Sequence, residues 1–337
     1  MSKHQNKYME SISIFFKGTK MYFQYIDKFL NYMTFPIFGQ LFAIIIIFFI
    51  TYLYANNLPD LMVKFPIFDN VLVALSLLLL FTVPAFFLFC KAFYEYLITF
   101  ASLNSIANNL SSKGKAKKLD TKVHSELIKR RSFSYVVMLL VLSLIYAVGL
   151  IPFFWVLLLI FMVYSSLTFQ VFALEENVGP IGAIKRSFVL IKHNFWATTL
   201  LLVLLFLFTY MLVPNIIVWA FEEADIVYYL SNPVEKFVRM LPLDVVSEFF
   251  QVYKINYIVE PYEIARNVVT SVISSIVITY TLPLRSCCCT LLYKKFDDEK
   301  IEENRKATRI DGRKEIKKIM KKETRITKKP EKEDESK

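Results

Sequence analysis

The sequence predicts an all-α, polytopic membrane protein with about six transmembrane helices and amphipathic helices at the membrane interface. Two observations lead to this fold class. Residues 132–174 are 43 consecutive residues without Asp, Glu, Lys, Arg or His. As one helix they would be roughly 65 Å long, about twice the thickness of a hydrocarbon core. Hydrophobic residues also make up 55% of the chain and aromatic residues 16%, more than the core of a soluble domain can bury.

This long apolar run is predicted to form a hairpin of two spans. Gly149 and Pro152 lie near its middle. Glycine loosens a helix, and proline removes a backbone donor and resets the chain direction. We therefore expect spans at residues 133–150 and 152–174, with almost no loop between them.

Four other apolar segments supply the remaining spans, at about residues 35–54, 71–94, 195–221 and 267–292. Pro84 and Pro214 fall inside two of these segments, where proline kinks a helix. Between the spans, the sequence predicts a short loop before residue 71, polar connections over 95–131 and 175–194, and an outer loop over 222–266.

The two ends of the chain are predicted to lie in the cytoplasm. Residues 1–34 hold apolar residues at helical spacing with charged residues between them, typical of an amphipathic helix. A helix lying on the membrane surface and a helix packed against the bundle both fit this pattern. No compact apolar region precedes a small-residue cleavage site, so we expect no cleaved signal. Residues 294–337 are expected to form a charged, partly helical tail.

The distribution of charge predicts the orientation. Sixteen Lys and Arg residues lie in the N-terminus and the two polar connections, against five in the two opposite loops. By the positive-inside rule, this places both termini in the cytoplasm of a protein of the cytoplasmic membrane. The net charge of +11 is concentrated beside the apolar segments and in the tail, which favours anionic lipid headgroups as partners. The tail has almost no aromatic residues to stack on bases, so we expect no specific nucleic acid.

The residues that carry catalysis or bind metals are not arranged for either purpose. The three histidines, His4, His124 and His193, have no second histidine at a metal-ligand spacing. Adjacent acidic residues such as Glu175 and Glu176 point in different directions on a helix. We therefore predict no catalytic residue, no metal and no cofactor, and a protein that is not an enzyme.

The polar residues inside the predicted spans are neutral. Gln170 is the most prominent, and Ser271, Ser274 and Ser275 share one helix face. Small hydroxylated residues let membrane helices approach closely, which favours a packing face over a substrate path lined by these residues. For the consecutive cysteines 287–289, an interfacial run of small residues is favoured over S-acylation.

The connection after the fourth span predicts a short helix on the membrane surface. Pro180 can start this helix, and apolar residues then recur on one face. Lys185, Arg186 and Lys192 could reach phosphate headgroups from it. The alternative is an elbow that only holds the fourth and fifth spans together.

Residues 172–196, FALEENVGPIGAIKRSFVLIKHNFW, resemble the signature of a family of six-span proteins related to the membrane domain of glycerophosphoryl diester phosphodiesterases. The matching positions are Gly179, Gly182, Arg186, Ser187, Phe188, Asn194, Phe195 and Trp196. The segment TLLYKKF at 290–296 resembles the ending of the family's sixth span, so that the resemblance covers roughly residues 20–296. It implies a membrane module without the catalytic barrel, because the chain has neither the length nor the residues for that barrel.

These observations predict a non-enzymatic integral membrane protein that acts as a transport-associated or membrane-organising module. One alternative is a passive permease for an amphiphile or a small polar solute, with a path lined by Gln170 and the serines of the sixth span. Another is a sensor that recruits a membrane or cytoplasmic protein partner through the charged tail.

Overall fold

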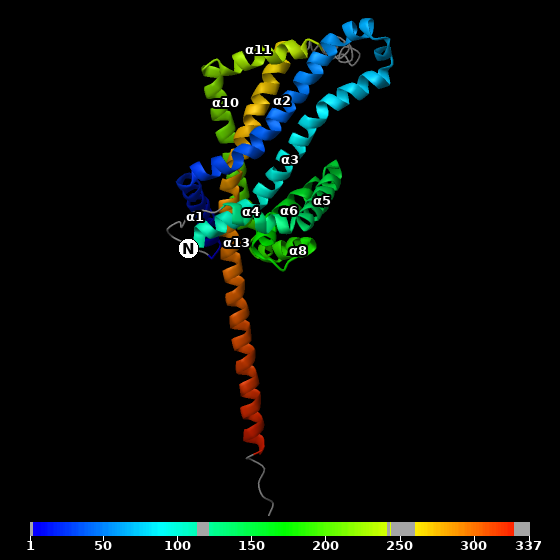
Figure 1. Cartoon of the computed structure of the whole chain (residues 1–337). Coiled ribbons are helices and arrows are strands. Elements are labelled where there is room, and N and C mark those ends of the chain that lie inside the picture. Colours follow the sequence, from blue (N-terminus) through cyan, green and yellow to red (C-terminus); the bar gives the residue numbers. More distant parts are fainter. Residues whose placement is uncertain (1–2, 113–120, 241–242, 244–259, 327–337) are drawn as a thin grey trace, which may run out of the picture.

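The computed structural model describes all residues except 1–2, 113–120, 241–242, 244–259 and 327–337 (Figure 1). The described residues form helices and short connections, with no strand among them, which confirms the all-α class. Six helical segments in this part of the chain are long and apolar enough to cross a membrane. They are Ile26–Lys64, Val71–Ser112, Ser132–Gly149, Pro152–Leu174, Phe195–Glu223 and Pro261–Glu302. The chain is therefore a multi-pass integral membrane protein.

Helix α1 (Lys3–Gln24) packs along the bundle. It runs antiparallel to α13 (Pro261–Ile326), because Tyr22 donates a hydrogen bond to the carbonyl of Tyr280 at 3.0 Å while Gly18 lies against Cys288. On another side, the Ser11 hydroxyl donates to the carbonyl of Ala197 at 2.9 Å. Of the two arrangements that the amphipathic pattern allowed, the structure has the packed one. Burial raises the pKa of Tyr22 to about 12, since its hydroxyl is enclosed between helices.

Helices α2 (Ile26–Lys64) and α3 (Val71–Ser112) form a long antiparallel pair joined by the short helix η1 (Pro66–Asp69). The predicted spans 35–54 and 71–94 lie inside them, but α3 continues for 18 residues into the predicted polar connection. Small and apolar residues of this extension recur at helical spacing and are buried against the bundle. They include Ile98, Ala101, Leu103, Ile106, Ala107 and Leu110. The next helix is α4 (Thr121–Arg130).

The apolar run forms the predicted hairpin. Helix α5 (Ser132–Gly149) is followed by the 3-10 turn η2 (Pro152–Phe154) and by α6 (Trp155–Tyr164). A Cβ atom on Gly149 would lie 2.6 Å from Cδ1 of Leu158, so that the glycine permits the close approach of the two helices. The break at Gly149–Pro152 is confirmed.

The fourth and fifth spans are both irregular. The fourth span is interrupted after α6 and resumes as α7 (Thr168–Leu174). This interruption was not predicted from the sequence. The amphipathic helix α8 (Pro180–Ile191) begins with Pro180 at its first turn, as predicted. In the fifth span, α9 (Phe195–Phe206) passes through a π-helical stretch, η3 (Leu207–Leu212), into α10 (Val213–Glu223).

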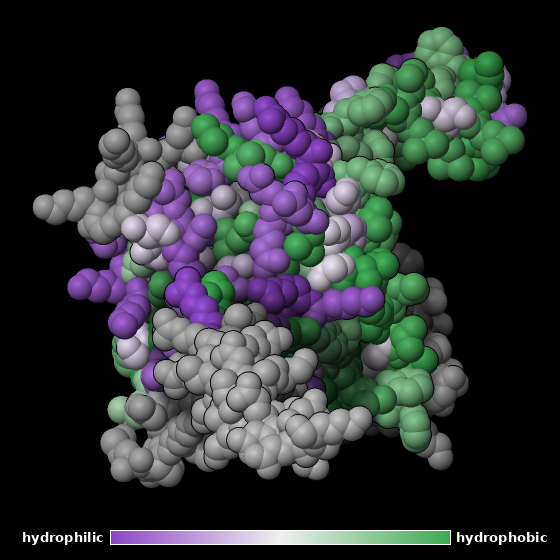
Figure 2. Space-filling view, turned by 90° about the horizontal axis from the view of Figure 1, so that it is seen from below, coloured by the Kyte–Doolittle hydropathy of each residue, from purple (hydrophilic) through white to green (hydrophobic). Residues whose placement is uncertain are grey.

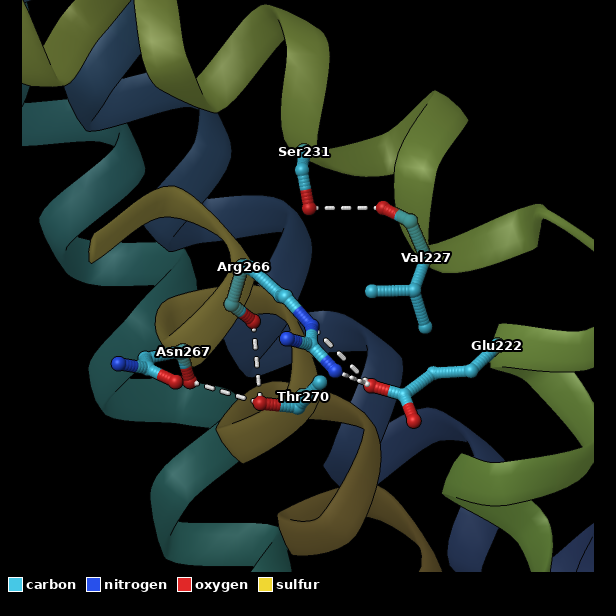
Figure 3. A network of polar contacts seen from close by, with 6 residues as sticks. All are labelled: Glu222, Val227, Ser231, Arg266, Asn267 and Thr270. Carbon is cyan, nitrogen blue, oxygen red and sulfur yellow. Dashed lines mark hydrogen bonds and ion pairs between the residues drawn. The ribbon is translucent and has the colours of Figure 1, made fainter. Parts of the chain in front are cut away.

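The end of the bundle farthest from the termini is held by α10, α11 (Ile226–Val238) and the start of α13 (Figure 1). Arg266 on α13 donates to the Glu222 carboxylate at 2.7 Å and 3.2 Å (Figure 3). Val227 packs against Val269 and Ile273 beside this pair. The predicted outer loop thus contains a helix, and its residues 241–242 and 244–259 lie outside the described residues.

The main core lies at the opposite end, called here the terminal end, where α1 begins and α13 leaves the bundle (Figure 1). Cys287, Cys288 and Cys289 belong to it and are at most 1% exposed, a placement that disfavours S-acylation. Seen from this end, hydrophilic side chains gather over the middle of the face (Figure 2). Helix α13 continues past the core to Ile326, 66 residues in all, or roughly 99 Å.

Candidate functional site at the break in the fourth span

The fourth span breaks at residues 165–167, between α6 and α7. A break frees backbone groups, which in an apolar setting need partners from elsewhere in the protein. The Ser187 hydroxyl on α8 donates to the carbonyl of Tyr164, the last residue of α6, at 2.6 Å. The Phe188 ring stacks on the Tyr164 ring with 5.0 Å between centroids. Helix α8 therefore satisfies the last carbonyl of α6 at the break.

Two buried amides meet beside the break. The Gln170 side chain on α7 donates from Nε2 to Oδ1 of Asn104 on α3 at 3.0 Å. Both residues are at most 4% exposed. The Thr290 hydroxyl on α13 lies 3.5 Å from the backbone carbonyl of Asn104, so that three helices join at this point. Neutral hydrogen bonds of this kind hold helices together where water is excluded.

Four buried side-chain oxygens around the break have no hydrogen-bond partner among the described residues. They are the hydroxyls of Tyr135, Ser166 and Thr168 and the Oε1 atom of Gln170. Buried polar groups are almost always paired, because an unpaired one costs about 1–3 kcal/mol. Their chemistry is that of neutral donors and acceptors, which suits water or the hydroxyl and amide groups of a small polar molecule.

Arg131 anchors the chain that leaves the break. Its guanidinium donates to the carbonyls of Phe172 at 2.8 Å, Val178 at 2.6 Å and Glu175 at 3.4 Å. It also lies 4.2 Å from the centre of the Phe172 ring. Burial lowers the pKa of Arg131, but a guanidinium titrates so far above neutrality that it stays charged. The Arg131 side chain thus supplies hydrogen bonds to backbone carbonyls at the end of α7 and in the turn that leads to α8.

An ion-pair network lies beneath the break. Arg186 on α8 pairs with Asp297 on α13 at 2.6 Å and with Glu175 at 3.3 Å. The Tyr293 hydroxyl donates to the Glu175 carboxylate at 2.8 Å. Lys294 donates to the Asn108 carbonyl at 3.2 Å and to the Ser111 hydroxyl at 2.6 Å. These contacts hold α13 against α3, α8 and the α7–α8 turn.

The structure separates the residues that the sequence analysis proposed for a site. Lys185 on α8 and Lys192 directly after it are exposed, whereas Arg186 is half-buried between two carboxylates. Ser271 and Ser275 are exposed and Ser274 is half-buried. Thr290, which contacts Asn104, lies 15 residues beyond Ser275 on α13, or about 22 Å along the helix. Gln170 and the serine face therefore do not line one continuous surface.

Sequence reasoning missed three residues that build this site. Arg131 was counted only as one of the basic residues of a connection, and Asn104 was placed in a polar segment outside the bundle. Ser187 stood in the family resemblance without a role. Only Asn104 carried a usable signal, because it lies among small and apolar residues at helical spacing in the segment FASLNSIANNL.

No family model, curated protein or solved structure matches the chain. Among the described residues, no group of three or more His, Cys, Asp or Glu side chains is placed to hold a metal ion. A function can therefore be inferred only from the contacts, burial and charge of the described residues.

Proposed function

We propose that the chain is a non-enzymatic membrane-organising module of the cytoplasmic membrane that holds a protein partner through the extension of its last helix, with both termini in the cytoplasm. The observation that carries this proposal is the continuity of α13. The helix leaves the sixth span without a break and continues to Ile326, well beyond Glu299, whose carboxylate accepts a hydrogen bond from Asn194 of the bundle. A continuous helix transmits position and force better than a flexible linker.

The way α13 is fixed supports this role. At the terminal end, Tyr293, Lys294 and Asp297 are bonded to α3, α8 and the α7–α8 turn, and Lys295 pairs with Glu10 of α1. A partner on the extension would therefore be held in a defined orientation relative to the membrane. The ionisable groups here are engaged with one another, which favours a structural role over general acid–base catalysis. The resemblance of residues 172–196 to a non-catalytic membrane domain agrees with this proposal.

Deletion of residues 306–337 tests the proposal. We expect the intact protein, purified in mild detergent, to carry a stoichiometric protein partner in a native mass spectrum. The deletion should remove the partner and leave insertion and melting temperature unchanged, because the contacts described above that fix α13 to the bundle all lie before residue 306. Deletion of 327–337 alone keeps the helix and serves as the matched control. A partner retained after the longer deletion, or no partner on the intact chain, would contradict the proposal.

The second candidate function is a passive permease for a small polar solute. The observation that favours it is the interrupted fourth span, where oxygens of Ser166, Thr168 and Gln170 have no hydrogen-bond partner in the described part of the chain. Broken helices at membrane depth often border solute sites, because the break exposes polar groups.

Gln170→Leu separates this candidate from the first. If the break conducts, glycerol flux into proteoliposomes should fall about tenfold or more, since the mutation leaves Asn104 without its amide partner and adds apolar bulk. Gln40→Leu is the control, because the Gln40 side chain donates to the Pro36 carbonyl of its own helix. Equal flux through the unmodified protein and the Gln170 variant would exclude the permease.

A further inference from the structure

An apolar groove of about 680 Å³ runs along the fifth span. Leu204 and Phe208 line its lower part, where Phe15 of α1 also contributes, and Met211, Asn215 and Trp219 line its upper part. The Phe15 and Phe208 rings meet edge to face with 5.9 Å between centroids. The groove thus begins where α1 packs on the bundle and rises toward the end farthest from the termini.

The backbone explains why the groove lies here. Pro214 has no amide hydrogen, and its ring would crowd the carbonyl of Tyr210 in a regular α-helix. The six residues Leu207–Leu212, which end two positions before Pro214, form a π-helix, and a π-helix has a wider turn. The wider turn displaces the side chains on either side of it from α-helical register. Met211 and Leu212, at the end of this stretch, are each about half exposed.

The position of the groove across the membrane follows from the number of residues along the fifth span. The span begins at Phe195, directly after the polar residues Lys192, His193 and Asn194. Asn215 is 20 residues farther, or about 30 Å, which is the thickness of a hydrocarbon core. Leu204 lies about 16 Å back from Asn215, close to the depth of one leaflet. Trp219 then falls at the interface, where tryptophan is enriched.

The shape and lining of the groove decide between a lipid chain and a helix of another protein. The groove is open along the roughly 22 Å from Leu204 to Trp219 and is lined almost entirely by apolar atoms. The residues that line the groove are large, whereas helix–helix contacts in membranes favour Gly, Ala and Ser. The length and the lining fit a single hydrocarbon chain.

We propose that this groove binds one acyl chain of a phospholipid from the leaflet opposite the chain termini. The chain lies along Met211, Phe208 and Leu204 and ends near Phe15. The amide of Asn215, exposed among apolar side chains, donates to an ester carbonyl of the same lipid at the interface. The proposal is independent of any partner bound to the extension of α13.

Photo-crosslinking of lipid to the full chain tests this site. The protein is reconstituted into vesicles of phosphatidylethanolamine and phosphatidylglycerol that contain a phosphatidylcholine with a diazirine in the middle of one acyl chain. After irradiation, the modified residues are mapped by mass spectrometry. We expect modification to concentrate at residues 204–212 and to exceed that at Leu144 on α5, although Leu144 is 68% exposed and Met211 only 50%.

Two variants and a control make the test specific. Met211→Trp fills the groove and should reduce this modification about tenfold, the effect of excluding a well-fitted chain. Asn215→Leu should reduce it about fivefold, the equivalent of one hydrogen bond. Leu144→Trp adds the same bulk outside the groove and should change nothing. Even modification of all exposed positions, no response to either groove variant, or crosslinking of the groove to a second protein chain would overturn the proposal.

Discussion

Replacing Gly18 with valine should destabilise the folded protein by about 2–4 kcal/mol, because it separates α1 from α13. A Cβ atom at this position would lie 2.3 Å from Sγ of Cys288 and 3.1 Å from its Cα and backbone nitrogen. The sulfur could rotate away, but the backbone atoms belong to the longest helix of the described structure and cannot. Thermal melting of detergent-solubilised protein, followed by size-exclusion chromatography, would measure the loss.

Two controls isolate this contact. Gly179→Ala introduces the smallest side chain where no heavy atom lies within 4 Å, and it should leave the melting temperature nearly unchanged. Cys288→Ala removes the sulfur, so that the pair Gly18→Ala and Cys288→Ala should show a coupling of about 1 kcal/mol in a double-mutant cycle. If Gly18→Ala instead stabilises the protein by about 1 kcal/mol, the gain expected on an exposed helix, α1 does not pack on α13.

The packing of α1 illustrates where sequence reasoning reached its limit. Its amphipathic pattern predicted a helix, but the same pattern suits a membrane surface and a protein surface. Gly18 and Cys288 are 270 residues apart, and neither has a local signal that specifies the other. The spans could be predicted because length and hydropathy alone are enough to define them. The partners of each helix depend on contacts between distant segments, which a single sequence does not reveal.

The break in the fourth span was missed for a related reason. Residues 152–174 carry no charged residue and, after Pro152, no Gly or Pro to mark an interruption. The helix stops at Tyr164, where Ser187 of α8 supplies the hydrogen bond to its last carbonyl. In contrast, the break at Gly149 and Pro152 was predicted correctly, because both residues act on their own backbone. Local breaks can therefore be predicted from sequence, whereas breaks made by tertiary contacts cannot.

The region after the break depends on a single side chain, and Arg131→Ala should therefore cost about 2–4 kcal/mol. The mutation leaves the carbonyls of Phe172, Glu175 and Val178 without their donor at the end of α7. It also removes the contact with the Phe172 ring. Arg131→Lys should recover only a fraction of the loss, because one ammonium group cannot reproduce the planar fork that reaches three carbonyls.

The neighbouring Arg130 provides the matched control. It carries the same charge at the next position and is exposed, so that Arg130→Ala should change stability by less than about 0.5 kcal/mol. Melting temperatures of the three variants, with limited proteolysis of residues 172–180, would compare them. Equal stability of the Arg130 and Arg131 variants would mean that net charge matters more than geometry here. A large loss confined to Arg131, with new cleavage in the α7–α8 turn, is expected because its hydrogen bonds fix that turn beneath the polar cluster at the break.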